Sequence, residues 1–122
     1  MDASQNYTQN QVLGLEQTEL ESRALIRTAS ALNAIMENWD ERKSELDEAL
    51  EKNRKLWTIL ASAMGEADCP QPEEVRRSIL NLAMFIFQRT VEILINPTPE
   101  KLNVLININM NTVSYTHLRA HE

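Results

Sequence analysis

The chain has 122 residues, a formal net charge of −6 and one cysteine, and 5% of its residues are aromatic. This length predicts one domain with a single modest core, and a composition rich in Leu, Ala, Glu, Asn and Ile favours helices over a turn-rich β fold. The negative charge argues against a general binder of nucleic acid or acidic membranes, and a single cysteine excludes an internal disulfide, which suits a reducing cytoplasm.

The first segment, residues 1–13, is polar and shows no apolar period, so we expect a flexible arm there. It has no basic stretch followed by an apolar one, so no signal peptide is visible. The domain itself is expected over residues 14–112. Its first helix is predicted from about Leu15 to Asn38, where apolar residues recur at helical spacing in two adjacent stripes, one beginning at Leu20 and the other at Leu25.

The second helix is predicted from about Glu41 to Met64, after a polar break in which Asp40 is a plausible N-cap. Six residues fall at alternating steps of four and three along it, which places them on one inward-facing side. They are Leu46, Leu50, Asn53, Trp57, Leu60 and Met64.

Trp57 poses a question, because it stands close to the basic pair Arg54 and Lys55. Its shared spacing with Leu50 and Leu60 predicts a core residue. Two alternatives remain: the indole docks a partner by its edge, or it stacks on a nucleic-acid base.

The third helix is predicted from Pro72 to Ile95, with Pro72 in the first turn and acidic residues at the positive end of the dipole. It is apolar on more than one face, so we expect it to be central or covered by a partner. The predicted core side includes Ile79, Leu82 and Ile86. Polar residues interrupt the apolar run, so we expect no membrane insertion.

Met84, Phe85 and Phe87 are the residues of this helix that we predict to contact a partner. Aromatic residues and methionine are enriched at interfaces, and methionine adapts to irregular partners. The alternative is that all three belong to the core.

The last helix is predicted to start at "NPTPEK", with Thr98 as N-cap and Pro99 in the first position. The alternation of apolar residues with asparagine over 106–111 would also fit a strand. The start signal and the helical context favour a helix. The resulting fold class is all-α, a small four-helix bundle-like domain with antiparallel neighbours.

The tail, residues 113–122, continues no apolar period and resembles a translated sequencing adapter. Both histidines, His117 and His121, lie in this tail. They are therefore left out of every functional argument.

The rest of the chain holds little catalytic chemistry. Without histidine it lacks the commonest general base and metal ligand, and the acidic residues around Glu45 to Glu51 spread over a solvated face. Cys69 lies in a loop with no base nearby, and two glycines cannot form a phosphate-binding loop. We expect no enzyme activity, no cofactor and no metal.

Arg54 and Lys55 remain candidates for partner contacts. Most basic residues have acidic residues within one helical turn, so a patch that binds RNA is the less favoured alternative.

Several segments resemble the FlaF family of flagellar regulators in alphaproteobacteria. They are "NWDER", "LDEALEKNRKLWTIL", "PEEVRRSILNLAMFIFQRTVEIL" and "NPTPEKLNVLININMN", in this order, over about residues 14–111. The chain departs from the family at "TVSYTHLRAHE", where relatives carry a short ending of small residues.

The resemblance implies a helical, non-enzymatic cytoplasmic protein that promotes flagellin synthesis and secretion. It implies flagellin as the partner, bound by a chaperone-like factor, beside the companion protein FlbT, which restrains flagellin messenger RNA. Two other functions stay open: post-transcriptional regulation through FlbT or the messenger RNA, and a structural adaptor of the flagellar export machinery.

Overall fold

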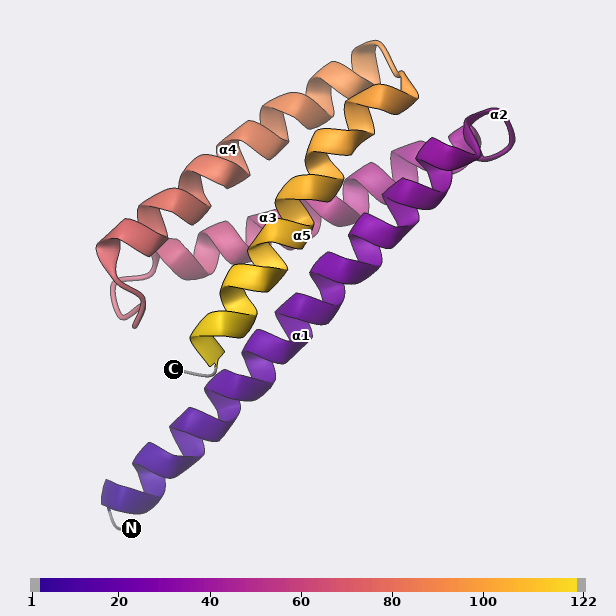
Figure 1. Ribbon diagram of the computed structural model, residues 1–122. Helices are drawn as coiled ribbons and strands as arrows, with labels where there is room; N and C mark the ends of the chain where they lie inside the picture. Colours follow the sequence, from indigo (N-terminus) through magenta and orange to yellow (C-terminus); the bar gives the residue numbers. More distant parts are fainter. Residues whose placement is uncertain (1–2, 121–122) are drawn as a thin grey trace.

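The computed structural model of the protein describes the backbone of residues 3–120 and the side chains of residues 19–114. Four long helices make up most of this range, no strand occurs within it, and short helical turns join the first pair and the last pair (Figure 1). The elements are α1 (Ala3–Glu37), α2 (Trp39–Arg42), the 3-10 turn η1 (Lys43–Glu45), α3 (Leu46–Gly65), α4 (Glu73–Ile95), the 3-10 turn η2 (Pro99–Lys101) and α5 (Leu102–Ala120). The predicted all-α class and the predicted fourth helix are therefore confirmed.

Successive long helices run antiparallel, but they do not form an even bundle (Figure 1). α3 packs against α1 on one side and α4 on the other, while α5 lies along α1. α4 ends just before η2 and α5 begins just after it. From this junction the two helices diverge, with few contacts between them. α4 is consequently supported by α3 and is left largely open on its other sides.

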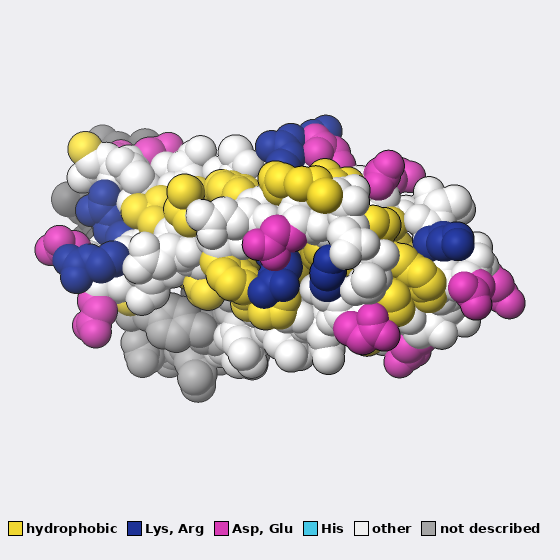
Figure 2. All heavy atoms as spheres, turned by 90° about the horizontal axis from the view of Figure 1, so that it is seen from above, with side chains coloured by type: hydrophobic (Ala, Val, Ile, Leu, Met, Phe, Trp, Pro, Cys, Tyr) yellow, Lys and Arg dark blue, Asp and Glu magenta, His cyan; other side chains and the backbone are white. Residues whose placement is uncertain are grey.

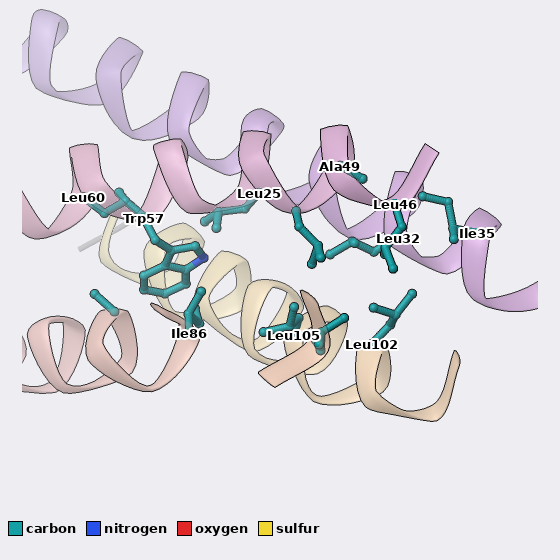
Figure 3. Packing of buried hydrophobic residues seen from close by; sticks show 13 residues of the cluster. Leu25, Leu32, Ile35, Leu46, Ala49, Trp57, Leu60, Ile86, Leu102 and Leu105 are labelled. Atoms are coloured by element: carbon teal, nitrogen blue, oxygen red, sulfur yellow. The ribbon is translucent and has the colours of Figure 1, made fainter. Parts of the chain in front are cut away.

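The core lies between α1, α3 and α5 and extends to the inner side of α4 (Figure 3). On α1 the stripe that begins at Leu25 supplies most of the buried residues, whereas Leu20 is 59% exposed. Each helix contributes at intervals of three or four residues, as a helix with one buried side requires. The buried apolar residues are Leu25, Ala29, Leu32, Ile35, Leu46, Ala49, Leu50, Trp57, Leu60, Ala83, Ile86, Ile93, Leu102 and Leu105.

The break after α1 differs from the prediction. Asn38 interrupts the helix and its side-chain Nδ2 donates a hydrogen bond of 2.9 Å to the carbonyl of Ala34. The chain becomes helical again at Trp39, so Asp40 lies inside the first turn of α2 and the prediction of Asp40 as an N-cap is wrong. α3 begins only at Leu46, after the turn η1.

The start of the last helix matches the prediction. Thr98 is extended at the N-cap and Pro99 occupies the first position of η2. Over α5, Leu102, Leu105 and Asn109 are buried at helical spacing, so the apolar–asparagine alternation belongs to a helix and not to a strand.

α1 begins at Ala3, earlier than the predicted start at about Leu15, and α5 continues to Ala120, beyond the predicted domain end at residue 112. Most side chains of the arm and the tail lie outside the described range, so the flexibility of residues 1–13 and the origin of residues 113–122 stay predictions.

Candidate functional site

α4 is the helix that the rest of the domain covers least. Pro72 precedes it with φ −57° and ψ 150°, and Glu73 and Glu74 stand in its first turn, where acidic side chains suit the positive dipole end. One side of α4 packs on α3, and its buried residues are Ala83, Ile86, Thr90 and Ile93. The other sides carry the features described next.

A groove of about 520 Å³ lies between the first half of α4 and the second half of α5. The groove lies where the two helices diverge and make few contacts with each other. Its lining is mainly apolar and includes hydroxyl, amide and carboxylate side chains. The lining residues are Glu74, Val75, Ser78, Ile79, Leu82, Ile108, Asn111 and Thr112. We call this feature the α4–α5 groove.

Phe85 stands next to the α4–α5 groove. It follows Leu82 by three residues and Ser78 by seven, so all three share one side of α4. The guanidinium carbon of Arg89 lies 5.4 Å from the centre of the Phe85 ring, within range of a cation–π contact. Arg89 also lines a second hollow of about 420 Å³ with Val104 and Asn107 of α5. The two hollows differ in character, because the second is lined mainly by charged and amide side chains, including Glu100 and Lys101.

A second apolar surface lies on the outer side of α4. It consists of Leu80, Met84, Val91, Leu94 and Ile95, which are 36%, 58%, 54%, 50% and 78% exposed. Figure 2 looks down on the side of the molecule that is uppermost in Figure 1, where α4 lies. Apolar side chains form a broken band across this side. We call these five residues the outer stripe.

Within the described residues, α4 is also the one helix long and apolar enough to cross a membrane by length and composition alone. Only 22% of its most apolar window is buried, whereas the core helix of a globular domain would be mostly buried. The apolar character of α4 therefore exceeds what packing inside this domain uses.

The three predicted partner-contact residues of α4 do not lie together. Met84 belongs to the outer stripe, and Phe85, 37% exposed, stands on the groove side. Phe87 is half-buried and packs against the core. Sequence reasoning identified α4 as the helix with excess apolar surface but did not separate its two apolar surfaces; the partner contact itself stays a prediction.

Arg54 and Lys55 lie on α3, whereas the outer stripe lies on α4. Arg54 is tied to Glu51 by two hydrogen bonds, of 2.6 Å from Nη2 and 3.0 Å from Nε. This hydrogen bonding lowers the pKa of the Glu51 carboxyl and raises the pKa of Arg54. The charge of Arg54 is thus matched within its own helix, while Lys55 is exposed.

Other basic residues are matched in the same way. Each pair joins residues three or four positions apart, within one helix or, for Arg42 and Glu45, across the junction of α2 and η1, so these residues do not gather positive charge on one face. The pairs are Arg23–Glu19, Arg42–Glu45, Lys52–Glu48, Arg77–Glu73 and Arg89–Glu92.

The residues predicted for the core have the following positions. Trp57, Leu50, Leu60 and Ile86 are buried, with Trp57 and Ile86 at 0% exposure. Figure 3 shows Trp57 of α3 directed toward Ile86 of α4. Ile79 and Leu82 are half-buried, because they form the wall of the α4–α5 groove while packing against the core.

Sequence reasoning missed a buried polar network around Trp57. Its Nε1 donates a hydrogen bond of 2.9 Å to Oδ1 of Asn109, a fully buried residue of α5. The Nδ2 group of Asn109 lies 2.8 Å from Oδ1 of Asn53 and 2.8 Å from Oγ1 of Thr28. The network joins α1, α3 and α5, and the only hint in the sequence was Asn53 at a predicted inward position.

The described residues contain no group of three His, Cys, Asp or Glu side chains placed to hold a metal ion. Cys69 is a free, half-buried thiol in the loop before α4. What the arrangement can do is bind: it offers an apolar groove with polar edges and an exposed apolar stripe.

In a comparison with protein families, the family model described as flagellar protein FlaF matches residues 3–114. No curated protein and no solved structure matches the chain.

Proposed function

Because this chain belongs to the FlaF family of flagellar proteins, we propose that it acts in flagellum biogenesis by binding flagellin as a chaperone-like factor that promotes flagellin synthesis and secretion. The observation that carries this proposal is the α4–α5 groove, a mainly apolar hollow of about 520 Å³. We place the protein in the cytoplasm, where newly made flagellin would meet it.

The shape of the groove suits a helical segment of a client. Two helices that diverge form the walls, and an amphipathic helix binds such a groove through apolar side chains repeated every three or four residues. Val75, Ile79 and Ile108 supply apolar wall, and the rim supplies Ser78 and Asn111 for polar contacts. A segment that would aggregate when free would be shielded there until export.

The pairing of basic residues supports a protein client over RNA. Arg54, Arg77 and Arg89 each lie within 3.5 Å of a carboxylate on the same helix. Phosphate contacts would have to compete with these pairs, and the net charge of −6 repels a polyanion. Regulation through FlbT remains compatible with the groove, because a protein partner could use the same apolar surface.

The test fills the groove without touching the core. Ser78 is an exposed side chain on the groove lining, so Ser78→Trp places an indole where the client's side chains would lie. Ser62→Trp is the matched control, because Ser62 is exposed on α3 and does not line the groove. Flagellin affinity is measured by calorimetry, with thermal unfolding recorded on the same samples.

We expect Ser78→Trp to weaken flagellin binding at least about tenfold, or about 1.4 kcal/mol, and Ser62→Trp to leave it unchanged. Phe85→Asp should also weaken binding several-fold to a hundredfold while the domain stays folded, since it sets a carboxylate beside the groove. Equal affinities for the two tryptophan variants would remove the groove from the interface. Binding of FlbT or of export components, with no flagellin bound at all, would assign the protein to the regulator or adaptor function instead.

A further inference from the structure

We propose that Glu74 selects the client segment that binds the α4–α5 groove, by pairing its carboxylate with a lysine or arginine beside the apolar face of an amphipathic client helix. The inference rests on the proposed function, because it states the client chemistry that the same groove recognises. Its starting point is that Glu74 is the one charged residue among the described residues that line the groove.

The carboxylate of Glu74 is not engaged by a basic residue within the described part of the chain. Glu73, the residue before it, pairs with Arg77 at 3.1 Å, whereas the ion pairs of the described residues do not include Glu74. The guanidinium of Arg76 is held elsewhere, because its Nε donates a hydrogen bond of 2.7 Å to the carbonyl of Met64 near the end of α3. A cation supplied by a client therefore meets no competing ion pair at Glu74.

Glu74 stands at the amino-terminal end of the wall that α4 gives to the groove. Glu74, Ser78 and Leu82 are four residues apart, so they form one row along α4 that rises about 12 Å. The wall supplied by α5 carries no charged residue among those described. A client helix that lies along the groove therefore meets a negative charge at one end of its apolar face.

Lysine and arginine suit this position better than other client residues. The long aliphatic part of either side chain packs along the apolar wall formed by Val75 and Ile79, while its charged end reaches the carboxylate. A client acid at the same place would be repelled by Glu74 and by the net charge of −6. The same repulsion acts on phosphate groups, so charge complementarity favours a protein segment with a basic border over RNA.

The experiment compares Glu74→Lys with Glu73→Lys in the full chain, with flagellin as the probe. Both glutamates are exposed in the first turn of α4, so the two variants change the net charge and the interaction with the helix dipole alike. Of the two residues, only Glu74 lines the groove. Flagellin affinity is measured by calorimetry at about 0.1 M and about 1 M sodium chloride, where the Debye length is about 10 Å and about 3 Å. Thermal unfolding is recorded on the same samples.

We expect Glu74→Lys to weaken flagellin binding at least about tenfold at the lower salt concentration, and Glu73→Lys to change it less than about twofold. Glu74→Gln should weaken binding about three- to fivefold, because it removes the attraction without adding a repulsion. The affinity ratio between the wild-type chain and each Glu74 variant should fall toward one at the higher salt concentration, since charge interactions are screened there.

A second arm of the experiment identifies the client residue. Flagellin variants that each replace one lysine or arginine by glutamate are tested against the wild-type chain and against Glu74→Lys. We expect one flagellin variant to bind the wild-type chain more weakly than unchanged flagellin does, and to bind Glu74→Lys more tightly. Such compensation requires a direct pairing, because a loss of affinity caused by altered folding of α4 would not be recovered by a change in the client.

Equal affinities of Glu74→Lys and Glu73→Lys for flagellin would overturn the inference, and so would the absence of any compensating flagellin variant. In both cases weaker binding by Ser78→Trp would still support the groove as the client site, with a client helix that lacks a basic border as its occupant. A wild-type chain that binds no flagellin would overturn the proposed function and this inference together.

Discussion

At the residue scale, one buried asparagine, Asn109, links three helices at the centre of the fold. Asn109 accepts the hydrogen bond of Trp57 through Oδ1, and its Nδ2 group faces Asn53 and Thr28. Its position in α5 therefore fixes how α5 sits on α1 and α3. Nδ2 of Asn53 is buried without a hydrogen-bond partner among the described residues, so the network carries a cost of about 1–3 kcal/mol at that atom.

Trp57→Ala tests the role of this tryptophan in the core. Trp57 has no exposed surface, and deleting a buried large aromatic side chain usually costs about 3–5 kcal/mol. We expect a loss of this size in urea unfolding followed by circular dichroism, a large part of the stability of a domain this small. Trp57→Phe keeps most of the apolar ring and should lose less. A loss under about 1 kcal/mol for Trp57→Ala would contradict the buried position.

Asn109→Ala tests the network itself. The change leaves the indole N–H of Trp57 without its acceptor and removes the donor to Asn53 and Thr28. We expect a destabilisation of about 2–4 kcal/mol, since each unsatisfied buried polar group costs about 1–3 kcal/mol. Asn107→Ala is the matched control, because it makes the same change of helix propensity at an exposed position of α5. If the two variants lost equal stability, propensity and not the network would explain the effect.

The helices themselves show how far periodicity predicts structure at the element scale. Apolar spacing located four long helices, and Thr98 with Pro99 predicted the start of the last one. The pattern could not tell that α4 and α5 diverge, because divergence depends on how α5 packs on α1, many residues away in sequence. For the same reason, Ile108 and Thr112 of α5 were not foreseen as neighbours of Val75 and Ile79.

The excess apolar surface of α4 is also a property of this single helix. Its sequence predicted more apolar surface than one side of a helix needs, and the structure divides that surface into core, groove and outer stripe. Sequence reasoning grouped Met84 with Phe85, although their neighbouring positions are about 100° apart on a helix. Asn109 was missed because the sequence does not distinguish a buried asparagine from the exposed Asn107 and Asn111.

Charge is the property that belongs to the whole molecule. The net charge is −6, yet six ion pairs between neighbouring residues of one helix or turn leave positive and negative side chains interspersed. Such exposed pairs contribute little to stability, typically about 0.2–1 kcal/mol each. Their larger effect is that no strong positive potential builds up at the surface. A partner must therefore be recognised mainly by apolar contact.

The salt dependence of client binding follows from that balance. Burial of apolar surface in the α4–α5 groove involves few charged groups, and its driving force does not weaken with ionic strength. We expect the Kd for flagellin to change less than about threefold between 50 mM and 200 mM sodium chloride, measured by calorimetry with the wild-type chain. A ligand held through six or more phosphate contacts would lose roughly 10³-fold or more in affinity over the same range, because counterions are released at each contact. The matching control is an RNA oligonucleotide from a flagellin message, tested in the same buffers. Steep weakening of flagellin binding would show that charged contacts dominate, and steeply salt-dependent binding of the RNA would favour the regulator function over the chaperone.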